Sequence, residues 1–401
     1  MTDPHMTPYR ILRARPLWIA NGVITGALAL LFTVFYVGAN IDPAGHLKNL
    51  PVALVDADTG ELGAHVAQGI AAAPGDKVEW KTMTEREART QLGKGKLYGA
   101  LVVPADFSVS VTALSNGTAT HRPTLTILTN QSAGSLGSSF ARQATTTAAT
   151  AASVQLGRQL ALPDKALAAD PIAVHVEDGH PLGDHSGVGL TAFYYSLVLV
   201  VCGMLAANVL TGQVDHALGY THNDMGPRRL HRPLIRATRV QTLAVSSTMM
   251  AGLSLVMGTL VMTGAVGIMG MDAGHLPLLW LYSVAAIAVC GIGALALLAV
   301  AGTPGMLLVT LVFIGMAVPT AGATTPLEAL PGFYRFLAEF EPLRQITGGV
   351  RSILYYDAQG DAGLTRGWLM MGVGLVSALA FGFGVTRLYD SKGLHRINLS
   401  P

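Results

Sequence analysis

Charged residues are scarce in this chain of 401 residues. They make up 12% of the sequence, whereas soluble domains carry about 25%. The net charge is only +2, and no basic run is interleaved with aromatic residues, so a nucleic-acid partner is not expected. Hydrophobic residues reach 51%. This composition is typical of a protein embedded in a lipid bilayer.

Cysteine is almost missing as well. The two that occur, Cys202 and Cys290, lie inside long apolar runs without acidic or histidine neighbours in those runs. Metal ligation by this pair is therefore disfavoured, and small buried thiols are expected. The more polar segment 41–187 contains no cysteine, so no disulfide bond stabilises it.

Motifs for catalysis and nucleotide binding are absent. The sequence has no Gly-x-x-x-x-Gly-Lys-[Ser/Thr] loop, and residues 93–96 only superficially resemble one. A Gly-x-Ser-x-Gly nucleophile elbow is also missing. His175, His180 and His185 lie near acidic residues, but a polar linker explains them better than a metal site. We therefore expect no catalytic residue, cofactor or metal, and any ATPase must be a separate subunit.

Several stretches contain no charged residue at all. A helix needs about 20 apolar residues to cross a bilayer. The uncharged stretch 273–327 is long enough for two such helices, with a turn at 301–305 where Gly and Pro interrupt it. The sequence thus predicts an α-helical polytopic membrane protein with six transmembrane helices, at about 17–38, 188–212, 241–268, 278–300, 306–322 and 367–387.

Basic residues predict the orientation of these helices. With six crossings, the clusters before the first helix, between the second and third, and after the last all fall on one side, which is the cytoplasm by the positive-inside rule. We expect a multi-pass plasma-membrane protein with both termini cytoplasmic. The predicted parts are 1–40 (N-terminus and first helix), 41–187 (extracytoplasmic domain), 188–390 (five-helix transmembrane domain) and 391–401 (cytoplasmic tail).

The first apolar run has a second interpretation. Val37 and Ala39 precede Asn40 as the small residues of a signal-peptide cleavage site do. The run is about 22 residues long, however, and signal peptides usually have apolar cores of about 7–15 residues. A retained membrane anchor is the favoured interpretation.

The segment 41–187 alternates strand-like and helix-like patterns. Short apolar runs predict strands at 52–55, 97–103, 124–128 and 172–176. Helices are expected at 61–72, 84–92, 105–114 and 131–160, the second starting with the capping box formed by Thr84 and Glu87. The prediction is an extracytoplasmic α/β domain inserted between transmembrane helices 1 and 2.

Motifs in both halves of the chain point to a family. The strongest is the run at 95–108, GKLYGALVVPADFS, and further likeness lies around residues 326–331 and 341–343. Together they resemble the phage-infection-protein (YhgE/Pip) family. The relatives of this family include nitrosoguanidine-resistance-type membrane proteins and type-2 ABC-exporter permeases. The motif positions in the outer domain are Pro51, Val55, Asp56, Trp80, Tyr98, Pro104, Phe107 and Ser108; those in the outer amphipathic segment 323–366 are Pro331, Phe336, Pro342 and Arg351.

The resemblance implies the permease half of an ABC-type exporter, working as a homodimer with a separate ATPase. The cytoplasmic loop 213–239 would receive the ATPase through a turn and a basic helix at 228–239. The alternative for this loop is an anchor on anionic lipid. Its candidate coupling residues are Gly226, Pro227, Arg228, Arg229, Leu230, Arg232 and Leu234.

The predicted spans contain no Asp, Glu, Lys or Arg. Such residues usually mark proton and ion pathways, so an ion-coupled carrier is disfavoured. The expected cargo is apolar or amphipathic: a lipid, an envelope precursor or a drug. The alternative function is a non-transporting surface receptor or scaffold, for envelope assembly or phage attachment.

Overall fold

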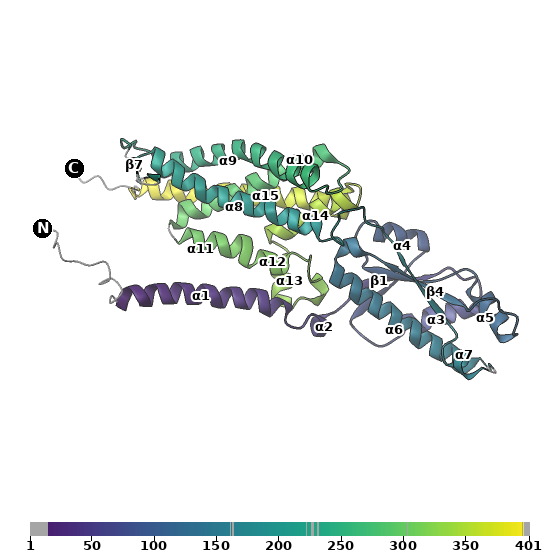
Figure 1. The fold of residues 1–401 in the computed structure, drawn as a ribbon. Helices are drawn as coiled ribbons and strands as arrows, with labels where there is room; N and C mark the ends of the chain where they lie inside the picture. Colours follow the sequence, from purple (N-terminus) through teal and green to yellow (C-terminus); the bar gives the residue numbers. More distant parts are fainter. Residues whose placement is uncertain are drawn as a thin grey trace.

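The computed structural model describes residues 15–160, 162, 164–221, 223–225, 228–230, 232–302, 304–394 and 396. They form an α/β domain and a helical body that lie end to end (Figure 1). Helix α1 (Arg15–Asn40) begins, and helix α15 (Leu364–Ser391) ends, at the end of the body away from the α/β domain.

The described part of the α/β domain contains one five-stranded sheet with the order β2-β1-β3-β4-β5. All neighbouring strands are parallel except β3 and β4, which are antiparallel. The four predicted strands are confirmed as β1, β3, β4 and β5. The edge strand β2 is exposed along much of its length, which explains its weak apolar pattern. The bounds are β1 Leu50–Asp56, β2 Val78–Thr82, β3 Gly99–Val103, β4 Thr124–Thr129 and β5 Ala173–Asp178.

Helices cover both faces of this sheet. Because side chains alternate along a strand, Leu101 and Val103 pack with Phe107 in one cluster, whereas Val102 packs with Leu92 in another. The capping box predicted at Thr84 is present and starts α4. The predicted helices are confirmed with small shifts in their bounds: α3 Glu61–Ala71, α4 Glu85–Leu92, α5 Phe107–Ser115 and α6 Ser135–Gln159; α7 Lys165–Ala169 and α2 Pro43–His46 are additional.

Five helices in the described residues are long and apolar enough to cross a membrane. Besides α1 and α15 these are α8 (Thr191–Ala217), α9 (Arg239–Met262, continued by a π-helical turn to Ile268) and α10 (Leu276–Ala301). Helix α10 is the most buried of the five. It packs against α8, α9 and α15 and forms the centre of the body.

The fifth predicted span, 306–322, is shorter than expected. It consists of α11 (Gly305–Thr310), a π-helical turn (Leu311–Gly315) and α12 (Ala317–Thr320). At 1.5 Å per residue its length is about 24 Å, below the ~30 Å of a hydrocarbon core. Composition alone did not indicate this, because the uncharged stretch continues beyond the point where the helix ends.

Two short helices, α13 (Gly332–Ala338) and α14 (Pro342–Tyr355), form the outer segment between α12 and α15. Tyr334 of α13 donates a hydrogen bond of 2.7 Å to the Val34 carbonyl of α1 and packs against Phe35. Helix α14 packs against α8, α10 and α15 near the α/β domain (Figure 1).

The prediction of a basic helix at 228–239 is wrong. Strands β6 (Asn223–Met225) and β7 (Arg228–Leu230) form an antiparallel hairpin, and residues 232–238 are not helical. Pro233 explains this, since proline lacks an N–H and disfavours helical geometry at the residue before it. Helix α9 starts only after Thr238, whose side chain forms a capping box with Gln241.

Candidate functional site

A polar cavity of about 190 Å³ lies where the α/β domain meets the helical body. Its lining comes mainly from the loop between α4 and β3, the segment that follows α12, and the helices α14 and α15 with the turn between them; Ala133 of the α/β domain also contributes. Four of its lining residues are basic, which is unusual for a chain with so few charges. The polar lining residues that matter most are Lys94, Tyr98, Arg344, Thr347, Arg351 and Arg366.

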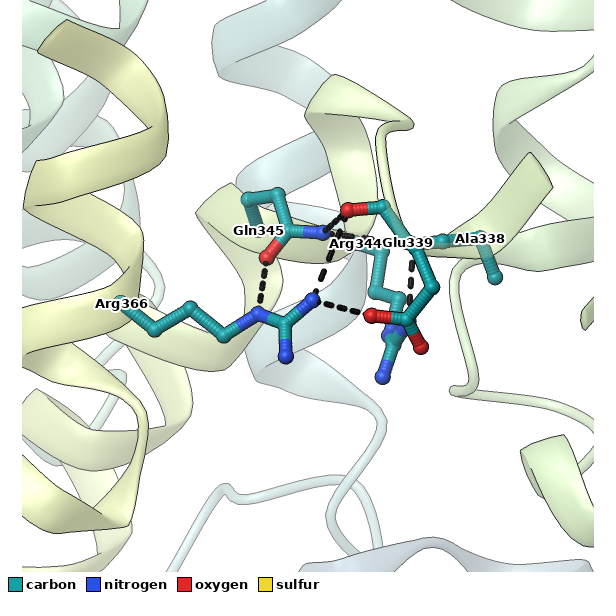
Figure 2. A network of polar contacts seen from close by, with 5 residues as sticks. All are labelled: Ala338, Glu339, Arg344, Gln345 and Arg366. Carbon is teal, nitrogen blue, oxygen red and sulfur yellow. Dashed lines mark hydrogen bonds and ion pairs between the residues drawn. The ribbon is translucent and has the colours of Figure 1, made fainter. Parts of the chain in front are cut away.

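One wall of the cavity is a network around Glu339, shown in Figure 2. Its carboxylate accepts hydrogen bonds from Arg344 Nη1 at 3.0 Å and from Arg366 Nη2 at 2.5 Å. The hydrogen bond from Arg366, reinforced by Arg344, lowers the pKa of Glu339. Gln345 accepts from Arg366 Nε at 2.9 Å and donates to the Glu339 carbonyl at 2.9 Å. The network holds α13, α14 and α15 together.

A second group joins the α/β domain to the helical body. Lys94 and Lys96 both donate to Asp361 Oδ2, at 3.0 and 2.9 Å. The bond from Lys96, together with that from Lys94, lowers the pKa of Asp361 to about 2. Tyr98 donates a hydrogen bond of 3.0 Å to Glu328, and burial raises the pKa of this tyrosine well above its usual value. These contacts fix the orientation of the domain on the body.

Arg351 is the cation without a matching carboxylate. Its Nη1 donates to the Gly322 carbonyl at 3.3 Å, and within the described residues it forms no ion pair. Its Nε and Nη2 are buried and have no hydrogen-bond partner in the described part of the chain. The same holds for the hydroxyl of Thr347, which also lines the cavity.

Glu341 sits directly behind this wall as the N-cap of α14. Its carboxylate accepts the N–H groups of Leu343 at 3.0 Å and Arg344 at 2.9 Å. Such capping satisfies donors that the first turn of a helix leaves free. Burial raises the pKa of Glu341 to about 7. Pro342 takes the first helical position, where a missing N–H costs nothing.

The structure separates the predicted motif residues into structural and cavity-lining ones. Pro51, Val55 and Asp56 lie in β1, and Trp80 lies in β2. Ser108 hydrogen bonds to Asp58, which braces the turn after β1. Only Tyr98 of the outer-domain motif reaches the cavity. Pro104 and Phe107 lead into α5, Phe107 as a buried core residue.

The motif residues of the segment 323–366 also include both structural and cavity-lining residues. Arg351 lines the cavity, Pro331 is the N-cap of α13, and Phe336 is 62% exposed. Tyr98 and Arg351 thus meet from two distant motifs. Arg344, Thr347 and Arg366 could not be identified in advance, because no local motif distinguishes them from other polar residues of their helices.

A second polar group lies at the opposite end of the body. Asp215 of α8 forms a bidentate ion pair with Arg396, at 2.5 and 2.7 Å. Asp390 of α15 accepts the N–H groups of Arg239 and Val240 at the start of α9, at 3.0 and 3.1 Å. These bonds tie α15 to the start of α9, and α8 to Arg396, which follows α15.

The predicted coupling residues belong to this loop. Gly226 and Pro227 lie outside the described residues, and of Arg228, Arg229 and Leu230 only the backbone is described. Arg232 and Leu234 are exposed, as is Ile235. Tyr220 holds the loop by accepting from the Ala237 N–H at 3.1 Å and donating to its carbonyl at 3.2 Å.

Among the described residues, no three His, Cys, Asp or Glu side chains gather to hold a metal ion. His180, from the histidine-containing linker, contacts the Tyr355 carbonyl at 2.7 Å and lies beside the ring of Tyr356. It therefore contributes to the joint between the α/β domain and α14.

Comparison with known proteins gives one match. A family model described as "Protein of unknown function (DUF3533)" matches residues 21–374. No curated protein and no solved structure matches the chain. Because the matched region takes in the α/β domain and most of the helical body, the chain belongs to the DUF3533 family.

Proposed function

We propose that this DUF3533 protein is the membrane subunit of an exporter that moves an apolar or amphipathic cargo outward. A separate cytoplasmic ATPase would supply the energy, since the sequence has no phosphate-binding loop of its own. The proposal includes a plasma-membrane location, six crossings, an extracytoplasmic α/β domain and cytoplasmic termini. The short helices α11 and α12 would make the fifth crossing, and Figure 1 shows them running along the body from its far end toward α13.

The observation that carries the proposal is the anchoring of the loop between α8 and α9. Tyr220, which follows α8, is hydrogen-bonded to Ala237 just before α9, and Asp390 of α15 accepts the first N–H groups of α9. A partner that pushes on the loop would therefore move these helices together. Leu234 and Ile235 are 41% and 55% exposed there and offer apolar contact to such a partner.

A homodimer is part of the proposal. Helices α1 and α9 are long and apolar, yet only 11% of the most apolar window of each is buried within one copy. Lipid covers such faces in a monomer, and a second copy would cover part of them in a dimer that encloses a path for cargo.

Thiol labelling on intact cells tests the topology. In a chain whose two native cysteines are replaced by alanine, an impermeant reagent should label S115C, which lies in the α/β domain, but not S391C at the end of α15. Both positions are exposed. Labelling at residue 391 without labelling at residue 115 would overturn the proposed orientation.

A paired substitution tests the coupling. Replacing Leu234 and Ile235 together by Asp should abolish co-purification of the ATPase and ATP-dependent export. The protein should still insert, because the loop arginines are unchanged. Val109→Asp is the matched control: Val109 is 71% exposed in the α/β domain, at the other end of the molecule. If the wild-type protein binds no ATPase even after cross-linking at position 234, the receptor or scaffold function replaces the exporter.

A further inference from the structure

The charges around the cavity between the α/β domain and the body do not balance. Arg344 and Arg366 share one carboxylate, Glu339, and the two lysines at 94 and 96 share another, Asp361. Each group therefore keeps a surplus positive charge. Arg351 adds a third surplus positive charge, against one negative charge on Glu328, the acceptor of the nearby Tyr98 hydroxyl. The cavity thus offers an electropositive site to an anion.

Free donors point to the same conclusion. The buried Nε and Nη2 of Arg351 have no partner in the described residues, and neither does the hydroxyl of Thr347. Thr347 is only 1% exposed. Buried polar groups in proteins are nearly always hydrogen-bonded. Three such donors on one cavity are arranged for a ligand that accepts several hydrogen bonds at once.

The cavity also has room for such a ligand. Its volume of about 190 Å³ is far above the ~10–15 Å³ that one water molecule needs on this measure. Gly348 faces open space: a Cβ added there would meet nothing within 4 Å. The helix backbone therefore leaves the space beside Thr347 and Arg351 clear.

We propose that this cavity binds a phosphate group, with Arg351 as its principal ligand and with Arg344, Arg366 and Lys94 supplying the surrounding positive field. A guanidinium presents a planar fork of donors that matches phosphate oxygens. Donors from both the α/β domain and α14 surround the space, which suits a tetrahedral anion better than a planar carboxylate. The proposal rests on the cavity and stands without the exporter function. The phosphate belongs either to a lipid headgroup or to a free ion.

Binding to the purified full-length protein in detergent tests this directly. Inorganic phosphate, titrated at constant ionic strength against chloride, should bind saturably and raise the melting temperature. Arg351→Gln should weaken binding at least tenfold, and Arg351→Lys should restore part of it because the charge returns. Arg335→Gln is the matched control, since Arg335 lies on neighbouring α13 outside the cavity lining. It should bind as the wild type does.

Gly348→Leu provides an independent test that leaves every charge in place. Its side chain would fill the cavity, so phosphate binding should be lost while the ligand-free melting temperature stays within a few degrees. The proposal is wrong if the wild type shows no saturable binding of phosphate in either form. It is also wrong if the Arg351→Gln and Gly348→Leu proteins, both folded, bind as tightly as the wild type.

Nanodiscs distinguish the two sources of phosphate. Phosphatidic acid in a phosphatidylcholine bilayer should compete with inorganic phosphate if the ligand is a headgroup with an exposed phosphate. Failure to compete, with inorganic phosphate still bound, assigns the site to the free ion.

Discussion

The buried carboxyl of Glu341 makes the stability of the helical body depend on pH. Glu341 is 3% exposed, and burial raises its pKa from 4.5 to about 7, although Arg344 opposes this effect. Between these two pH values the folded protein holds a proton that the unfolded chain has released. Stability is therefore complete below pH 4.5 and falls as the pH rises to about 7.

The size of this loss follows from the two pKa values. Each pH unit between them corresponds to about 1.4 kcal/mol. The interval from 4.5 to about 7 thus corresponds to roughly 3 kcal/mol at neutral pH. This is a substantial part of the ~5–15 kcal/mol that holds a typical domain folded.

Glu341→Gln isolates the effect, because glutamine keeps an oxygen that can accept the N–H groups of Leu343 and Arg344 but carries no charge. When unfolding of the purified protein is followed at pH 5 and pH 8, the unfolding free energy of the glutamine variant relative to the wild type should be higher at pH 8. Glu87→Gln is the control. Glu87 also caps a helix, but it is exposed, and the hydrogen bond from the Thr84 N–H lowers its pKa.

For Glu87 the sign is opposite: its contribution is present at neutral pH and is lost as the pH falls through its lowered pKa. A stability difference between wild type and Glu341→Gln that is the same at pH 5 and pH 8 would refute the reasoning. So would a glutamine variant that is less stable than the wild type at pH 8 only.

Two further substitutions test the packing. Val102→Asp places a carboxyl in the core under β3 and should destabilise the α/β domain by at least about 4 kcal/mol at pH 7, since keeping that carboxyl neutral costs about 1.4 kcal/mol per pH unit above 3.9. The amides of β3 should then lose their protection from hydrogen exchange. Val109→Asp, at an exposed position, should leave this protection unchanged. Gly349→Ala would bring a Cβ to 2.1 Å from the Tyr282 hydroxyl, which is fully buried, and should lower the unfolding free energy by roughly 1–3 kcal/mol. Gly348→Ala on the same helix meets nothing within 4 Å and should leave the melting temperature unchanged or slightly raised; equal effects at the two glycines would contradict the packing.

The α/β domain was predictable because its signals are local. Short apolar runs bounded by turn residues marked β1, β3 and β4, and the Thr84 capping box marked α4. The apolar helices were found for the same reason, since a membrane-length run needs no knowledge of its neighbours. The resemblance to a known family singled out Tyr98 and Arg351, but it did not indicate that they line one cavity.

The remaining features depend on contacts between distant parts of the chain. Lys94 and Asp361 are 267 residues apart, and no pattern around either one indicates the other. The end of α12 at Thr320 was not visible in a stretch that stays uncharged to residue 327. Residues 228–239 were mistaken for a helix because their arginines indicate topology and not conformation, while Pro233 acts locally against helix.

The joint between the α/β domain and the body is partly made of exposed ions. Asp361 is 52% exposed, and Lys96 is 43% exposed. Attraction between exposed charges weakens as ions of the medium accumulate around them, whereas the hydrogen bond between Tyr98 and Glu328 is partly buried and less accessible to those ions. Rising salt concentration therefore weakens the ion pairs of Asp361 with Lys94 and Lys96 more than the hydrogen bond between Tyr98 and Glu328.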